Sequence, residues 1–314
     1  MKRLALGLCV IFVAIGLGQE SPPGFGGQAQ YRFGVGARAL ALAGAFTAVA
    51  EGPEVAYWNP AATPWAQRGF GGMHTQPFAG LAGDLGIYVN YLGVASSDGA
   101  WGLAGGWFNT HVSGIPYTEG DVTGTFDYNS SVFLVGGGLR REFEFGAVAA
   151  GLTLKFYRET MLHGYAQGLG LDLGVLADLG GVRVGYCSQD IGGTRYQWQG
   201  TGQRPVVEVP WVHRLGVAAR WSEGLVLTVA EAELVLGNVP DLKMGLEWTP
   251  VSWFLLRGGV RLTSVPNAGY RPVWSLGLGV SWEAFSMDVA YLHNPLSGLA
   301  LPASTYVFSL SVRF

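Results

Sequence analysis

Few side chains in this sequence could do chemistry, and their spacing builds none of the common catalytic or metal sites. The histidines lie apart, at the expected ends of strands or in loops, without i, i+4 spacing or carboxylate partners. No serine, histidine and acid can be gathered at one place, as a hydrolase would require. We therefore expect no enzyme activity, no catalytic residue, no cofactor, and no metal site built from His74, His111, His163, His213 or His293.

One phosphate-binding pattern occurs near the N-terminus. Residues 34–39, GVGARA, fit the G-x-G-x-x-G/A dinucleotide fingerprint and precede a stretch with helix propensity. No buried strand leads into the match, so we interpret it as a coincidence. Cys9 falls in an expected signal peptide, which leaves Cys187 as a single thiol. We expect it to be a small buried apolar residue and not part of a disulfide.

The composition favours short membrane-crossing strands. Of 314 residues, 50 are glycine and only 13% are charged, against roughly 25% in an ordinary soluble domain. Hydrophobic residues make up 49%, yet beyond the N-terminus no apolar run approaches the ~18 to 20 residues of a transmembrane helix. A net charge of −3 supplies no basic field for nucleic acid. Polytopic helical membrane proteins and nucleic-acid binders are excluded.

Residues 1–18 have the features of a signal peptide. Lys2 and Arg3 precede an apolar run over residues 4–17, which ends in small residues before the polar Gln19. An anchoring helix is the weaker alternative, because the run is shorter than a bilayer span and Pro22 and Pro23 follow. We expect an exported chain that resides in the bacterial outer membrane.

From residue 69 onward, apolar residues alternate with small or polar ones, which indicates strands with two unlike faces. In residues 271–283 the apolar row runs from Trp274 to Trp282, and aromatic residues that bracket an aliphatic band are typical of a bilayer-crossing strand. The opposite face carries Gly and Ser, which suits a crowded barrel interior better than the wet face of a soluble sandwich. Residues 225–234 break the phase and predict a bulge or a shifted register.

The connections between these windows alternate between tight turns and longer segments. Turns are expected near 96–99, 141–144, 179–181, 222–224, 249–250 and 283–284, and loops near 111–128, 158–166, 189–210, 235–240, 264–271 and 294–303. Outer-membrane barrels have this asymmetry. We therefore predict an all-β membrane protein, a closed antiparallel transmembrane β-barrel of about 14 strands over residues 69–314.

The segment before the barrel carries an ordered set of short motifs. Residues 36–62 hold a Gly-Ala-Arg opening, a Gly-Ala-aromatic core, an acidic turn and a Trp-Asn-Pro-Ala sequence. This order resembles the N-terminal region of the FadL superfamily of outer-membrane transporters, most closely its PorV/PorQ-like branch. The resemblance implies a hatch over residues 19–68 that occupies the barrel lumen. Its candidate gating and ligand-facing residues are Arg38, Phe46, Tyr57, Trp58, Asn59 and Pro60.

The residues of this segment also favour a packed hatch on their own. The Ala/Leu-rich stretch 38–50 predicts a helix too short to span a bilayer, and Asn59-Pro60 predicts a turn. A disordered export linker is the weaker alternative, because the segment is too apolar to remain in solvent. The charges expected on the lumen face carry both signs and should pair across the interior: Lys155, Asp172, Lys243, Glu247, Arg257, Arg261 and Arg313.

The C-terminal strand ends like the signal read by the outer-membrane barrel assembly machinery. Apolar residues recur at every second position up to a terminal phenylalanine, and we expect the whole row to face lipid. The residues of this expected assembly signal are Tyr306, Phe308, Leu310, Val312 and Phe314.

Two functions stay open at this point. The resemblance implies a transporter that passes fatty-acid-like or aromatic molecules across the outer membrane by lateral exit, with hatch movement as the release step and capture by the loop residues Tyr117, Phe126, Tyr128, Tyr196 and Trp198. The alternative is a PorV/PorQ-like structural or cargo-binding barrel of a secretion system, without small-molecule transport. Expected partners are outer-membrane lipid, the barrel assembly machinery, and either a hydrophobic substrate or secretion-system proteins.

Overall fold

The computed structural model describes residues 33–77, 86–119, 122–200, 204–236, 238–265, 269–293 and 304–314. The expected signal peptide lies outside these ranges. The described helical segments are short, and none is long and apolar enough to cross a membrane. They are α3 (Ala37–Ala41), α4 (Val55–Trp58), η1 (Pro60–Trp65) and η2 (Ser222–Gly224).

The described residues form sixteen strands. In chain order they are β1 (Gly69–Thr75), β2 (Gly86–Ser97), β3 (Trp101–Glu119), β4 (Val122–Phe143), β5 (Gly146–Met161), β6 (Gly164–Asp178), β7 (Val182–Gln189), β8 (Thr194–Gln199), β9 (Val206–Val209), β10 (Val212–Trp221), β11 (Val226–Val235), β12 (Asp241–Val251), β13 (Phe254–Val265), β14 (Gly269–Trp282), β15 (Phe285–His293) and β16 (Ser304–Arg313).

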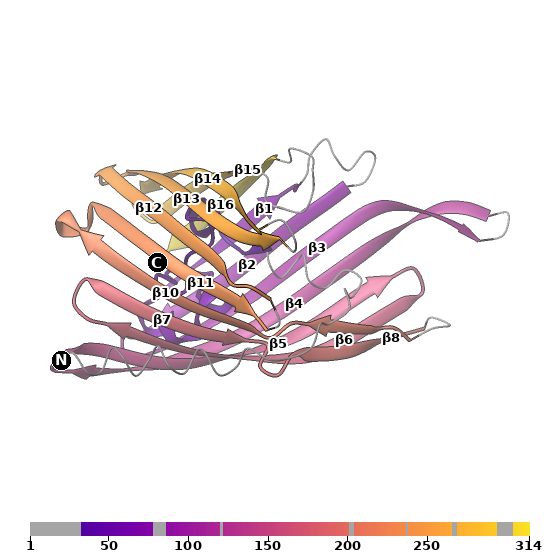
Figure 1. Cartoon of the computed structure of the whole chain (residues 1–314), viewed down its shortest axis with the longest axis horizontal. Helices are drawn as coiled ribbons and strands as arrows, with labels where there is room; N and C mark the ends of the chain where they lie inside the picture. The colour runs from indigo at the N-terminus through magenta and orange to yellow at the C-terminus, as the bar shows by residue number, and fades with distance from the viewer. Residues whose placement is uncertain are drawn as a thin grey trace.

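Fourteen of these strands close into one antiparallel barrel (Figure 1). Each of β1–β7 and β10–β16 pairs with its neighbours, β7 pairs with β10, and β1 pairs with β16 to complete the ring. Closure removes the free sheet edges within the barrel, which a strand in lipid could not leave unpaired. The predicted closed barrel of about 14 strands is confirmed.

The remaining two strands, β8 and β9, follow β7 and precede β10 in the chain, and they pair with each other as a hairpin. It joins the barrel where Tyr165 pairs with Gln199 and Ala166 with Trp198. Its alternate residues Thr194, Tyr196 and Trp198 are buried. The described residues of the expected loop over 189–210 therefore include a hairpin that packs its aromatic residues inward, and Tyr196 and Trp198 are not exposed capture residues.

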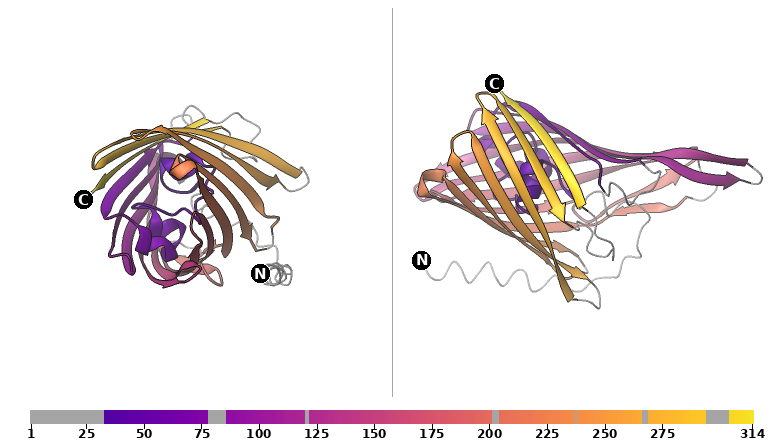
Figure 2. Two further views of the ribbon diagram at one scale, coloured as in Figure 1. Left: turned by 90° about the vertical axis from the view of Figure 1, so that its left-hand side faces the viewer. Right: turned by 90° about the horizontal axis from the view of Figure 1, so that it is seen from above.

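The two ends of the barrel differ. At one end the strands join through tight turns, including 98–100, 179–181 and 283–284, and Phe314 lies beside Arg68. At the other end β3 and β4 continue far beyond the barrel as a two-stranded ribbon (Figures 1 and 2). We call these the short-turn end and the ribbon end.

Two expected loops are strands instead. The described residues of 111–128 belong to the β3–β4 ribbon, with a register shift between Val112 and Ile115. The segment 158–166 consists of the paired ends of β5 and β6 and the tight turn 162–163 that joins them. Cross-strand pairing of β-branched and aromatic residues extends the ladder through sequence that lacks strict alternation. The expected loop at 294–303 lies outside the described residues.

The expected bulge in 225–234 is also absent from the described strand. β11 pairs with β10 and β12 without a register shift. Leu227, Val229, Glu231 and Glu233 all point inward and are buried. The alternation is interrupted in the sequence because the inward row is apolar where the hatch packs on it and acidic where buried cations face it.

The outer face carries a continuous apolar band. On β14 the row from Trp274 to Trp282 is 39–75% exposed, while Ser275 on the opposite face is buried. A water-exposed apolar surface of this extent is not found on soluble monomers, so the band faces lipid. The C-terminal row follows the same rule: Tyr306, Phe308, Leu310 and Phe314 are exposed, and Val312 is half-buried on the same face.

Candidate functional site

The described part of the hatch, residues 33–68, lies inside the barrel (Figure 2, left). Its side chains are almost all buried, and α3 and η1 pack against opposite parts of the wall, α3 on β13–β16 and η1 on β2–β6. The hatch occupies the half of the lumen nearer the short-turn end. A segment with so much apolar surface is stable in this place because the wall excludes water from it.

The helix in the hatch is shorter than the sequence predicts. It covers Ala37–Ala41 and not 38–50, because the chain leaves the helix at Ala43, whose φ is +58°, and Gly44, whose φ is +73°. The amide of Gly44 donates to the carbonyl of Ala39, and that of Ala43 to Leu40, which is the Schellman arrangement. Helix propensity is overridden here by the need to turn inside a narrow lumen.

The predicted turn at Asn59-Pro60 is present and anchors the hatch. Asn59 caps η1 by accepting a hydrogen bond from the amide of Ala61 at 3.0 Å. Its side-chain nitrogen donates to the carbonyl of Thr47 at 3.0 Å and to that of Val175 on β6 at 3.4 Å. Because Asn59 is fully buried, one amide side chain ties two parts of the hatch to the wall.

Three aromatic candidates form the core of the hatch. The indole nitrogen of Trp58 donates to the carbonyl of Val35 at 3.0 Å. The Trp58 ring meets the edges of Phe46 and Tyr57 at centroid distances of 5.8 and 5.1 Å. The guanidinium of Arg214 on β10 lies 5.1 Å from the Trp58 ring. Trp58, Phe46 and Tyr57 therefore hold the fold of the hatch together, with a wall cation over them.

Arg38 joins the hatch to the wall on its short-turn side. Its guanidinium binds Glu247 on β12 at 2.8 Å and Glu51 at 3.1 Å. Glu51 also binds Arg183 on β7 and Arg220 on β10, at 3.1 and 2.6 Å. Burial would raise the pKa of Glu51, but these three guanidiniums outweigh it and hold that pKa below its usual range. Glu51 was not predicted as a site residue.

Wall side chains also satisfy the backbone of the hatch. The carboxylate of Glu231 accepts from the amides of Phe46 and Thr47, at 3.0 and 2.9 Å. The hatch has little secondary structure of its own, so its buried backbone groups need such partners. Further wall residues that bind hatch backbone are Tyr91, Thr153, Gln189, Lys243, Ser275 and Ser309.

A ring of glycines lets the wall approach the hatch this closely. On eleven strands an inward-facing glycine lies where a Cβ would press on the hatch. At Gly259, for example, a Cβ would lie 2.6 Å from the backbone nitrogen of Ala43. This explains the high glycine content of the inner face. The ring consists of Gly71, Gly93, Gly102, Gly138, Gly151, Gly174, Gly185, Gly216, Gly245, Gly259 and Gly277.

The charges on the lumen face pair with one another, as predicted for most of them. Lys155 binds Asp172 and Asp190 at 2.8 and 2.9 Å. Lys243 binds Glu231 and Glu233 at 3.0 and 2.8 Å. Arg257 binds Glu247 and Asp288, and Arg261 binds Asp241. Arg313 instead donates hydrogen bonds to uncharged groups, the side chains of Gln67 and Ser281 and the carbonyl of Glu283.

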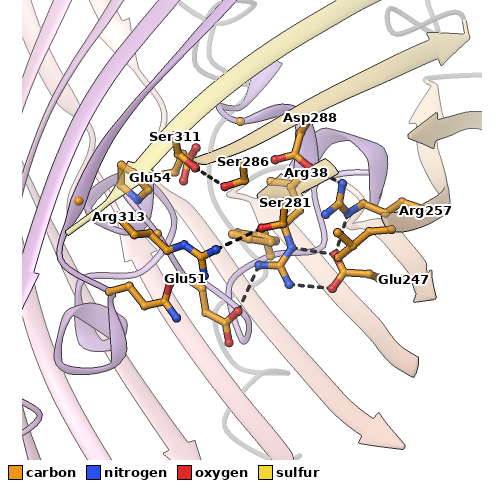
Figure 3. Close-up of a pocket in the computed structure, with 18 of the residues that line it drawn as sticks. Arg38, Glu51, Glu54, Glu247, Arg257, Ser281, Ser286, Asp288, Ser311 and Arg313 are labelled. Carbon is orange, nitrogen blue, oxygen red and sulfur yellow. Dashed lines mark hydrogen bonds and ion pairs between the residues drawn. The ribbon is translucent and has the colours of Figure 1, made fainter. Parts of the chain in front are cut away.

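A polar cavity of about 490 Å³ lies between the hatch and β12–β16 at the short-turn end (Figure 3). Charged and hydroxyl side chains line it, among them Arg38, Glu54, Asp288, Ser311 and Arg313. Burial raises the pKa of Glu54 to about 7. Charged groups on this side of the hatch therefore lie beside apolar ones such as Phe46 and Val280.

The lumen on the ribbon side of the hatch carries a group of buried apolar and aromatic residues beside buried polar ones such as Thr110, Ser130 and Glu159. The apolar and aromatic members are Val89, Phe108, Val132, Tyr157, Ala166, Trp198, Val207, Val273, Leu292 and Val307. The rings of Tyr157 and Tyr196 stack at 5.8 Å, so the β8–β9 hairpin closes over this region. We call it the upper lumen.

A buried glutamate without a basic partner among the described residues lies in the upper lumen. Glu159 on β5 is 2% exposed, and its carboxylate accepts a hydrogen bond from the hydroxyl of Tyr196 at 2.7 Å and another from Tyr128. Sequence analysis did not single out Glu159, because an isolated glutamate near a strand end is usually solvated. Of the other expected capture residues, Tyr117 and Phe126 meet edge to face on the ribbon at 6.2 Å.

Fold and site together define a transmembrane β-barrel whose lumen is filled by a wall-bound hatch. No family model and no curated protein sequence matches the chain. Solved structures do share its fold. The P. putida toluene transporter TodX has a TM-score of 0.60 at 13% identity, covering 90% of this chain and 99% of its own.

Two further solved structures agree. The CymD monoaromatic hydrocarbon channel has a TM-score of 0.61 at 13% identity, over 90% of this chain and 98% of its own. A Pseudomonas aeruginosa FadL homologue has 0.57 at 13% identity, over 88% and 97%. The chain thus shares the fold of these three solved structures over 88–90% of its length.

Proposed function

We propose that this protein is an outer-membrane channel of the FadL superfamily that binds hydrophobic small molecules and passes them across the outer membrane. The observation that carries the proposal is the upper lumen, where buried apolar and aromatic side chains gather on the ribbon side of a wall-bound hatch. Such a region gains free energy by removing an apolar ligand from water. The similar solved structures include a toluene transporter and a monoaromatic hydrocarbon channel.

The charged groups on the short-turn side of the hatch support a lateral exit. A hydrophobic ligand that moved straight through the barrel would have to break the wall contacts of the hatch and then pass the charged groups Arg38, Glu54 and Asp288. Removing water from these charged groups opposes that route. Passage through the wall into the lipid avoids both costs. With the usual barrel orientation, the short-turn end faces the periplasm.

An uptake assay tests this function. The full chain is expressed in a bacterial strain without other hydrophobic-compound channels, and uptake of labelled toluene and labelled palmitate is followed. We expect saturable uptake of at least one of them above the empty-vector strain. Uptake equal to the empty-vector strain for both compounds, with the barrel present in the outer membrane, would contradict transport.

The PorV/PorQ-like cargo-binding role remains the second candidate, and the β3–β4 ribbon favours it. In the described chain, β2 stops pairing with β3 at Ser113 and β5 stops pairing with β4 at Tyr128, so both ribbon edges beyond these points lack a strand partner. Free edges can add a strand from another protein. Shortening the ribbon by residues 115–126 should abolish secretion of a cargo protein in this role and leave toluene uptake unchanged.

A further inference from the structure

A row of oxygen acceptors crosses the upper lumen at one level. Thr110 on β3 pairs in register with Ser130 on β4, and Ser130 pairs with Glu159 on β5. Directly paired side chains on one face of a sheet have Cβ atoms about 4.5–5.5 Å apart. The three side chains therefore present a hydroxyl, a hydroxyl and a carboxylate side by side.

Two members of this row have no partner. The hydroxyls of Ser130, 1% exposed, and Thr110, 8% exposed, make no hydrogen bond within the described chain. A buried polar group without a partner costs about 1–3 kcal/mol. Native proteins rarely leave two such groups beside a buried carboxyl unless something else binds them.

The carboxylate of Glu159 also lacks a counter-ion. Within the described residues, tyrosine hydroxyls bind it and no lysine or arginine forms an ion pair with it. Lys155, the inward cation four residues away on β5, is already held by Asp172 and Asp190. Glu159, Asp172, Asp190 and Lys155 are thus three acids and one base, and the neighbouring Arg214 and Glu233 pair with each other, so the balance favours a positive ligand.

Aromatic rings surround the same row. Tyr157 lies next to Glu159 on the inner face of β5 and stacks on Tyr196. Trp198 pairs with Ala166, which in turn pairs with Glu159. Faces of tyrosine and tryptophan attract cations. A cation held here would meet a carboxylate, two hydroxyls and aromatic rings.

We propose that the row Thr110, Ser130 and Glu159 is a binding site for the protonated amine of a hydrophobic ligand. An ammonium group carries three N–H donors, and the row offers three acceptors. The apolar body of the ligand would lie among Phe108, Val132 and Trp198. This inference rests on the proposed hydrophobic-ligand function and gives it a substrate class, in which a carboxylate-bearing ligand is disfavoured by Glu159.

The test uses four aromatic probes of nearly equal size. Calorimetric titrations of the purified full chain in detergent at pH 7 compare benzylamine, benzyl alcohol, benzoate and toluene. We expect benzylamine to bind at least tenfold more tightly than benzyl alcohol and benzoate to bind weakest. The Glu159→Gln variant keeps the shape and removes the charge, so it should lose the preference for benzylamine and keep toluene binding.

Control variants separate the site from general effects. Thr110→Val combined with Ser130→Ala should weaken benzylamine binding several-fold, while Glu142→Gln, an exposed change at the short-turn end, should leave all four affinities unchanged. Heat-modifiable migration verifies that each variant forms the barrel. If one variant does not form it, the ranking of the four probes on the unmodified chain still tests the amine site.

The outcomes distinguish this inference from the proposed function. If toluene and benzyl alcohol bind but benzylamine is no tighter, the amine site is refuted and hydrophobic binding stands. The same holds if Glu159→Gln leaves the ranking unchanged. If none of the four probes binds, both the amine site and the proposed function are contradicted.

Discussion

The guanidinium of Arg38 in the hatch forks across the carboxylate of Glu247 on β12, with Nε and Nη2 each 2.8 Å from one carboxylate oxygen. Bidentate pairs of this kind fix geometry as well as supply energy. Because Arg257 binds the same carboxylate, Glu247 connects the hatch to the network of the wall. The Arg38–Glu247 pair is therefore expected to hold the hatch in place against the wall.

Replacing Arg38 by Ala should loosen the hatch and raise ion conductance in planar bilayers, because Glu51 and Glu247 lose a shared cation and water can enter beside α3. We expect a further increase when Trp58, Asn59 and Pro60 are also replaced by Ala. Arg141→Ala, an exposed site near the end of β4, serves as the control. Conductance that stays at the level of the unmodified barrel in all variants would show that the hatch does not depend on these contacts.

The glycine ring gives a matched pair of neighbouring substitutions. Gly259→Ala places a Cβ 2.6 Å from the nitrogen of Ala43, whereas at Gly258, on the lipid face, the nearest atom is a Leu276 methyl at 3.7 Å. We expect the inward change to lower the free energy of unfolding by about 1–3 kcal/mol, as overpacking does, and the outward change to have little effect. Urea unfolding in detergent, followed by heat-modifiable migration, measures both. Equal effects at the two positions would contradict a close hatch contact.

Deleting Phe314 should reduce the yield of assembled barrel. Its ring lies on the outer face, 6.4 Å from the ring of Phe70 on β1, and its amide donates to the carbonyl of Arg68. The deletion therefore removes both the end of the expected assembly signal and a contact that closes β16 onto β1. Outer-membrane fractionation quantifies the folded form, with Phe143→Ala at a lipid-facing site as the control. A normal yield from the shortened chain would argue against both roles.

Glu54 predicts a pH dependence of stability. Burial raises its pKa to about 7, and Asp288 adds to the shift, while its backbone amide and Arg38 oppose it. The folded chain thus binds more protons than the unfolded chain between about pH 4.5 and 7, so this group lowers stability as pH rises through that window.

Replacing Glu54 by Gln should then raise the urea midpoint at pH 8 and leave it nearly unchanged at pH 4. The control is Glu142→Gln, an exposed pair member at the short-turn end that should shift neither midpoint. A gain of equal size at both pH values would mean that the carboxyl stays charged in the folded state throughout this range.

The alternation of residue types by itself determined the barrel. Two-fold periodicity decides which side chains face lipid, and this depends only on neighbours along one strand, as in the row from Tyr306 to Phe314. Glycine and serine on the inner face likewise predicted a filled interior. The pairing of Lys155, Lys243 and Arg257 with acids was predictable because unpaired charge is not tolerated in such an interior.

Only the tertiary structure decided how the interior is used. The end of α3 at Ala41, the binding of Glu231 to hatch amides and the meeting of Thr110, Ser130 and Glu159 each join residues far apart in the chain. Strand register and barrel closure set these contacts, and local propensity carries no information about them. A glutamate at position 159 has the same local sequence whether it faces water or an aromatic chamber, so its environment is known only once the strands are placed.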